Sequence, residues 1–121
     1  MKNTEKLSFK NKNKAMISVG SWKVVEPQQV VMLLAEANYT TIYFLDGEKM
    51  IVATPLKALE NRFRSFSFFR LHKSYMVNLH FVKDFTSGEI MQVSLKNDFK
   101  FVVSRRKRRA FRKEFAMLSV A

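Results

Sequence analysis

The chain is divided into short apolar runs of strand length, and this pattern most constrains how it can fold. Each run is bounded by turn-forming residues such as Gly, Pro, Asn, Asp and Ser. Asp46-Gly47 lies between two runs, and this dipeptide predicts a hairpin with a type I′ turn. Trp22, in the first segment, is expected to be a core or interface anchor. The predicted strand segments are 16–25, 30–34, 40–45, 49–53, 75–78, 81–85, 90–95 and 99–103.

The period of the pattern changes once inside the chain, after Thr54-Pro55. Thr54 suits a helix N-cap, and Pro55 suits the first helical position, where its missing N–H is not needed. Leu56, Leu59 and Phe63 then share one face of a short helix. Many short strands around one helix predict a single, mainly antiparallel β domain over residues 16–121. Residues 1–15, rich in Lys and Asn, are expected to form a flexible basic arm.

Composition narrows the possible functions. The 121 residues carry a formal net charge of +12, which favours a polyanionic partner, either nucleic acid or an acidic membrane surface. No apolar run reaches the roughly 20 residues of a membrane span, so a cytoplasmic protein without a membrane partner is expected. With no cysteine and two histidines, no metal site is expected. Three glycines and no paired carboxylates argue against an enzyme, a cofactor or a small-molecule substrate.

A basic run precedes the last predicted helix, whose apolar stripe is Phe111, Phe115 and Leu118. Ser104 can cap this helix, and residues 105–109 place five cations in and directly after its first turn, where the macrodipole disfavours positive charge. A bound phosphate would reverse that penalty, so the run predicts a binding surface. A solvated basic face and a nuclear import signal are the alternatives.

The segment from Arg70 to Asn78 begins with basic residues and continues as a strand. It resembles the R-x-H-x-S-[YF]-x-V-N signature of the LytTR family, DNA-binding domains found mostly in bacterial response regulators. By this resemblance Lys73 faces DNA, while Arg70 is either a second phosphate clamp or a structural partner for a buried acceptor. His72 is expected to hold the loop by hydrogen bonds. Ser74 and Asn78 are expected to order the turn and strand ends.

Two further segments are similar to the family pattern, which covers roughly residues 22–113. Glu36-Ala37-Asn38-Tyr39 resembles the family's E-A-x-x-N-Y, although the spacing is compressed. Asn38 could read an adenine edge or simply form a turn, and Tyr39 could contact a phosphate or sugar. After Val-Ser-Arg-Arg, Arg106 falls at the position of a family arginine that contacts DNA, with Arg105 beside it.

The resemblance implies an elongated antiparallel fold of about ten strands with a short internal helix and a short C-terminal helix. It implies a bacterial transcription regulator whose loops read successive major grooves and bend the duplex at direct-repeat promoter sites, with a second copy possible on the DNA. An RNA-binding module is the main alternative, and a membrane-surface or protein-interaction module is another. Family members usually carry a receiver domain, for which this chain has no room. A stand-alone regulator, a piece of a longer protein and a protein controlled by a partner therefore all stay open. The expected DNA contacts are Asn38, Tyr39, Arg70, His72, Lys73, Arg105, Arg106, Lys107 and Arg109.

Overall fold

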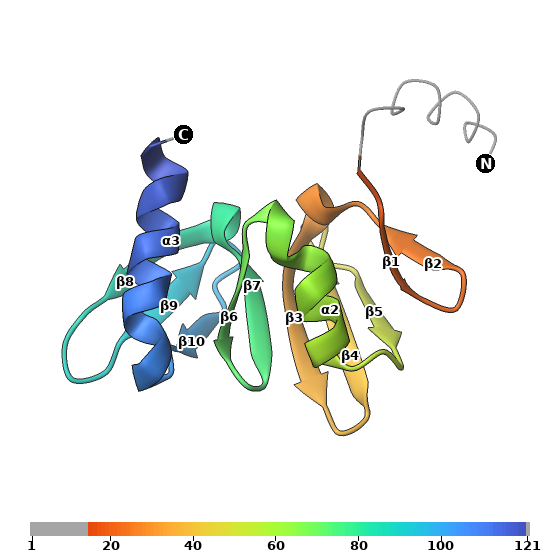
Figure 1. The fold of residues 1–121 in the computed structure, drawn as a ribbon, viewed down its shortest axis with the longest axis horizontal. Coiled ribbons are helices and arrows are strands. Elements are labelled where there is room, and N and C mark those ends of the chain that lie inside the picture. Colours follow the sequence, from red (N-terminus) through yellow and green to blue (C-terminus); the bar gives the residue numbers. More distant parts are fainter. Residues whose placement is uncertain (1–14, 121) are drawn as a thin grey trace.

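The structure is a computed structural model that describes residues 15–120, with side chains described as far as Leu118. The described residues form an elongated molecule built mainly of short strands (Figure 1). The strands are β1 (Ile17–Gly20), β2 (Lys23–Val25), β3 (Val30–Glu36), β4 (Tyr39–Phe44), β5 (Lys49–Val52), β6 (Phe68–His72), β7 (Tyr75–Asn78), β8 (Val82–Thr86), β9 (Gln92–Leu95) and β10 (Lys100–Val102). The helices are α2 (Leu56–Phe63) and α3 (Arg108–Val120), and the 3-10 turns are η1 (Pro27–Gln29), η2 (Arg64–Phe66), η3 (Leu79–Phe81) and η4 (Arg105–Lys107). Apart from Ala15, the predicted N-terminal arm lies outside the described residues.

The strands form three antiparallel sheets. The central sheet has five strands in the order β5-β4-β3-β7-β6, and it is flanked by the β1–β2 hairpin and by a three-stranded sheet in the order β10-β9-β8. Every strand pair in the described residues is antiparallel. The predicted fold class, an elongated antiparallel domain with two short helices, is confirmed.

The central sheet is covered on both faces, which divides the core in two. Leu33 and Met76 pack with α2 and the β1–β2 hairpin, whereas Met32 and Val77 pack with β8–β10 and α3. Adjacent residues of a strand point to opposite faces, so each core takes alternate side chains. Asn78, also buried, donates from Nδ2 to the Val30 carbonyl and accepts from the His80 N–H, both at 2.9 Å. The expectation that Asn78 orders the end of its strand is confirmed.

The predicted hairpin at Asp46-Gly47 forms, but its turn type is different. A type I′ turn needs two residues with positive φ, and here only Gly47 has one, at 93°. The Gly47 N–H donates to the Phe44 carbonyl at 3.0 Å, and the Phe44 N–H donates to the Glu48 carbonyl at 2.9 Å. This pattern is that of a longer connection with a glycine bulge. The type I′ prediction was wrong because the Asp46 carboxylate accepts from the Glu48 N–H at 2.9 Å and orders the longer turn.

Helix α2 begins one residue later than predicted. Pro55 is the N-cap and Leu56 the first helical residue. The Thr54 hydroxyl donates instead to the Val19 carbonyl of β1 at 2.7 Å, while the Thr54 carbonyl accepts from the Thr40 hydroxyl of β4 at 2.7 Å. The predicted cap was wrong because partners distant in sequence engage Thr54. The predicted apolar stripe is buried as expected: Leu56, Leu59 and Phe63.

Two further differences lie near the ends of the described chain. Trp22 is not a core residue, because it is 100% exposed, whereas Val25 of the same hairpin is buried. The basic run does not begin the last helix either, since residues 105–107 form the separate turn η4 and α3 starts at Arg108. Ser104 makes no side-chain capping bond. The predicted stripe of α3 is confirmed, with Phe111 fully buried and two partners half-buried: Phe115 and Leu118.

Candidate nucleic-acid interface

Three segments that are far apart in the sequence meet along one edge of the domain, the lower edge in Figure 1. The first is the β3–β4 turn at residues 37–38. It lies beside the β6–β7 turn because β3 pairs with β7 and the Ala35 N–H donates to the Ser74 carbonyl at 2.8 Å. The third segment, leading into η4, is joined to β6 by a bond from the Ser104 N–H to the Leu71 carbonyl at 3.1 Å. The sheet pairing therefore brings the three predicted contact segments together.

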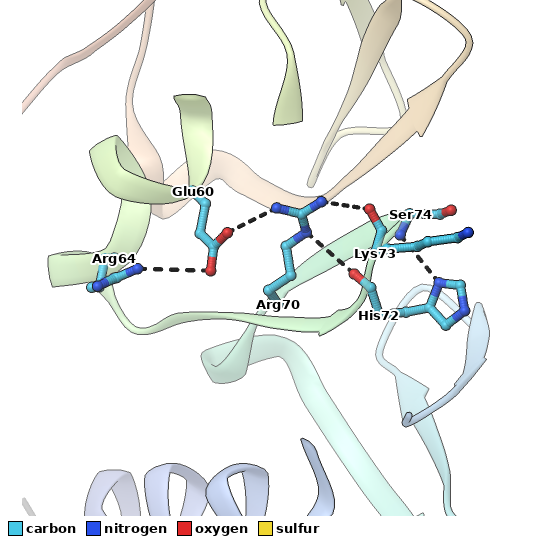
Figure 2. A network of polar contacts seen from close by, with 6 residues as sticks. All are labelled: Glu60, Arg64, Arg70, His72, Lys73 and Ser74. Atoms are coloured by element: carbon cyan, nitrogen blue, oxygen red, sulfur yellow. Dashed lines mark hydrogen bonds and ion pairs between the residues drawn. The ribbon is translucent and has the colours of Figure 1, made fainter. Parts of the chain in front are cut away.

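Arg70 shapes the β6–β7 turn from inside the molecule (Figure 2). Its Nε donates to the His72 carbonyl at 3.2 Å and its Nη2 to the Lys73 carbonyl at 2.5 Å. Its Nη1 lies 2.8 Å from Oε1 of Glu60 on α2, and the Arg70 side chain is only 16% exposed. Of the two roles expected for Arg70, these contacts favour structural partner over phosphate clamp. Glu60 also pairs with Arg64, at 3.7 Å.

The His72 ring is held on the other side of the same turn. Its Nδ1 accepts from the Ser74 N–H at 3.1 Å, and its ring stacks on Tyr75 at 4.8 Å between centroids with an 11° interplanar angle. Tyr75 in turn donates from its hydroxyl to the Val102 carbonyl at 2.6 Å, which ties β7 to β10. Burial raises the pKa of Tyr75 above its usual 10.0 because the charged phenolate would be desolvated. His72 therefore holds the loop, as expected.

Lys73 lies at the exposed tip of this turn. Its carbonyl is held by Arg70, while its ammonium has no hydrogen bond or ion pair with any described residue. Lys73 and Arg106 line one hollow of about 350 Å³. The ammonium of Lys73 is therefore unpaired among the described residues, although Arg70 holds the backbone of its turn. The other lining residues are Glu60, Arg70, His72, Ser104 and Lys107.

The basic run from 105 to 109 divides into cations that hold the fold and cations that face solvent. Arg108 belongs to the first kind, since its Nη1 and Nη2 donate to the carbonyls of Gly88 and Glu89 at 3.2 and 2.6 Å. Lys107 is half-buried, with Nζ 5.9 Å from the centre of the Phe69 ring. The exposed cations, which have no partner among the described residues, are Arg105, Arg106 and Arg109.

The β3–β4 turn presents polar and aromatic side chains at the other end of this edge. Its left-handed residue is Ala37, with φ of 52°, rather than Asn38. Asn38 is exposed, and Tyr39 is 54% exposed. Both line a hollow of about 430 Å³ together with Lys57 and Arg70. Lys57, on the first turn of α2, is exposed and is not among the predicted contacts, because nothing local in its sequence indicates that α2 lies beside the turn.

The described residues contain no group of three His, Asp or Glu side chains that could hold a metal ion. Within the same part of the chain, neither helix has the length and apolar character needed to cross a membrane.

The three antiparallel sheets and the net charge of +12 are those of a small β-rich domain with a surface suited to a polyanion. Residues 20–116 match the family model of the LytTr DNA-binding domain. This match covers most of the chain, so the chain belongs to the LytTr DNA-binding domain family, a family of DNA-binding transcription regulators and not an enzyme class.

Individual relatives agree with this assignment. The sensory transduction protein LytT of Oceanobacillus iheyensis is 33% identical over 63 residues, which are 52% of this chain and 26% of that protein. The chain therefore matches only a minor part of the length of this curated relative. A solved LytTr DNA-binding domain from Bacillus cereus has a TM-score of 0.67 and 22% identity, over 84% of this chain and 94% of that chain. At this identity the likeness shows the fold.

Proposed function

We propose that the basic edge formed by the β3–β4 turn, the β6–β7 turn and η4 binds duplex DNA in a sequence-specific manner. Its loops would enter successive major grooves at direct-repeat promoter sites, in the cytoplasm of a bacterium. The observation that carries the proposal is the placement of exposed Lys73 and Arg106 on one hollow, with Asn38 farther along the same edge. A net charge of +12 supplies the attraction for phosphate.

The proposed roles follow from the contacts of each side chain. Lys73, Arg106 and Asn38 are exposed and have no side-chain partner among the described residues, so they are the proposed base-reading groups. The residues proposed to bind phosphate or sugar are Tyr39, Arg105, Lys107 and Arg109. Arg70 and His72 belong to the interface as residues that hold the Lys73 turn in shape. Sequence discrimination would come from the first group, assisted by DNA bending.

The first experiment selects bound duplexes from a random pool and then measures variants on the selected site. Lys73→Ala and Arg106→Ala are each expected to weaken binding by about 1–3 kcal/mol if the residue reads a base, without loss of fold. Lys96→Ala is the matched control. Lys96 is also exposed, but it lies away from the proposed edge. Its N–H donates to the carbonyl of Phe81, which follows β7, whereas Lys73 precedes β7. Wild-type affinity in both test variants would refute the proposal.

Salt dependence separates phosphate contacts from base contacts. The logarithm of affinity should fall steeply and linearly with the logarithm of salt concentration, and removal of a phosphate-binding cation should reduce the slope by about one. Arg105→Ala and Arg109→Ala are the variants for this measurement. A nearly flat salt response of the wild type would contradict the electrostatic part of the proposal.

Binding at direct repeats requires a fixed spacing between the half-sites of the selected duplexes. Two copies on one face of the duplex require repeats about 10–10.5 base pairs apart, or a multiple of that spacing. Selected duplexes with one half-site, or with repeats at random spacing, would contradict the direct-repeat part.

The RNA alternative is tested by competition of single-stranded RNA against the selected duplex. Both faces of the central sheet are covered, which leaves no stacking platform there for bases.

A further inference from the structure

The turn of the β1–β2 hairpin exposes an aromatic side chain on an unfavourable backbone. Ser21 and Trp22 have φ of 27° and 70°, values that residues with a side chain seldom adopt. The Trp22 side chain is 100% exposed, so no burial within the domain offsets this strain. A turn needing positive φ is ordinarily occupied by Gly or Asn. Trp22 thus breaks a local rule without a gain inside the described structure, which is characteristic of functional positions.

The hairpin is fixed against the rest of the domain. The Thr54 hydroxyl donates to the Val19 carbonyl at 2.7 Å, and Nη1 of Arg62 donates to the Ser18 carbonyl at 3.2 Å. A Cβ atom at Gly20 would lie 2.6 Å from Oγ1 of Thr54, so the two segments are in close contact. Trp22 therefore projects from a held support.

The hairpin adjoins the β3–β4 turn, at one end of the edge that carries the proposed DNA contacts. A hollow of about 610 Å³ is lined by Lys23 of the hairpin together with Tyr39 and Arg62. Tyr39 also lines the neighbouring hollow with Asn38 and Lys57. Tyr39 thus lies between the Asn38 end of the proposed edge and the hairpin, which is at the right-hand end of the molecule in Figure 1, above the level of the β3–β4 turn.

We infer that the β1–β2 hairpin is a further DNA-contacting element, in which Trp22 packs on the sugars or bases of the duplex and Lys23 binds phosphate. The inference rests on the proposed function. Lys23 is exposed and has no partner among the described residues, so an unpaired cation directly follows Trp22 in the chain. This charge suits nucleic acid, whereas a second copy of a chain with net charge +12 would be repelled. Apolar side chains insert between base steps of a duplex in some DNA-binding proteins, and aromatic rings beside cations stack on the bases of single strands in others.

The experiment uses the intrinsic fluorescence of Trp22, which is the sole tryptophan of the chain. On titration with the selected duplex, its emission is expected to change, and its quenching by acrylamide to fall several-fold at saturation. Trp22→Ala should weaken duplex binding about tenfold, the size expected for loss of an aromatic contact to nucleic acid, and Trp22→Phe should weaken it less. Circular dichroism checks that both variants fold. Met117→Ala, which removes another exposed apolar side chain, from α3, is the matched control.

The outcomes distinguish this inference from the proposed function. In one outcome, Lys73→Ala and Arg106→Ala weaken binding, but the duplex changes neither the emission nor the quenching of Trp22, and Trp22→Ala binds like wild type. The inference is then overturned and the proposed function stands. If the duplex protects Trp22 while both other variants bind like wild type, the hairpin is a contact and the proposed edge is wrong. A change of Trp22 emission with protein concentration in the absence of DNA would assign the hairpin to self-association and overturn the inference.

Discussion

Glu60 pairs with two arginines in different surroundings, and this difference predicts very unequal pair energies. Nη1 of Arg70 lies 2.8 Å from Oε1 of Glu60, and the two side chains are 16% and 26% exposed. Nη2 of Arg64 lies 3.7 Å from Oε2 of the same carboxylate, and Arg64 is 67% exposed. A hydrogen bond between charged groups that are largely shielded from water contributes about 1.5–3 kcal/mol. An exposed pair one helical turn apart contributes about 0.3–0.5 kcal/mol.

Two double-mutant cycles that share Glu60→Gln measure these two pair energies. One cycle combines it with Arg70→Met and the other with Arg64→Met, so that each arginine loses its guanidinium and keeps an unbranched side chain. The coupling free energy between Glu60 and Arg70 is expected to be about 1–2 kcal/mol after discounting for partial exposure, against at most about 0.5 kcal/mol for Glu60 and Arg64. Urea denaturation followed by circular dichroism measures both values.

The same variants test whether the pair holds the Lys73 turn. Because Arg70 donates to the carbonyls of His72 and Lys73, its loss should weaken duplex binding as well as stability, whereas Arg64→Met should leave binding near wild type. Equal coupling energies in the two cycles would refute the reasoning from burial. Wild-type DNA affinity in folded Arg70→Met would refute the positioning role.

Three shorter predictions concern the fold. Tyr75→Phe should lower the free energy of unfolding by about 0.5–1.5 kcal/mol at neutral pH, since it removes the 2.6 Å bond to the Val102 carbonyl. Because the folded-state pKa of Tyr75 is raised, the phenol of the unfolded chain ionises first as the pH rises above 10.0. Wild-type stability should therefore fall at high pH. Urea titrations at high pH should show that Tyr75→Phe lacks this part of the fall. Gly20→Ala should lower the free energy of unfolding by about 1–3 kcal/mol, because its Cβ would lie 2.6 Å from Oγ1 of Thr54. Calorimetry should show a smaller loss for Gly47→Ala, whose Cβ would meet nothing within 4 Å. Phe111→Ala should cost about 3–5 kcal/mol in a thermal melt because the side chain is fully buried; a loss below about 1 kcal/mol would contradict its place in the core.

Much of the fold was predictable because its signals are local. Short apolar runs between turn residues indicated antiparallel strands, and the spacing of Leu56, Leu59 and Phe63 indicated the buried face of α2. The C-terminal helix with its buried Phe111 followed from the same reasoning. Resemblance to the LytTR family supplied what periodicity could not, namely that the segments near 38, 73 and 106 work together.

One error occurred where a local preference competed with a partner distant in sequence, and others where a turn took a geometry that residue types did not indicate. Thr54 was expected to cap α2, but its hydroxyl bonds to the Val19 carbonyl in β1. Trp22 was expected to be an anchor of the core or of an interface, and the structure excludes the core because the turn geometry directs the side chain into solvent. The η4 turn separates Arg105–Lys107 from α3, although residues 105–109 read as one continuous basic helix start.

The strand-rich class, the buried faces of the two helices and the cationic character of the chain follow from residue type and short-range spacing alone. Which cations are free depends instead on contacts between segments that lie apart in the sequence. Arg70 and Arg108 are engaged by Glu60 and by backbone carbonyls, whereas Lys73 and Arg106 have no side-chain partner among the described residues. This could not be read locally because Glu60 lies on α2, 10 residues from Arg70, and the Gly88 and Glu89 carbonyls lie in the loop between β8 and β9, 20 and 19 residues from Arg108.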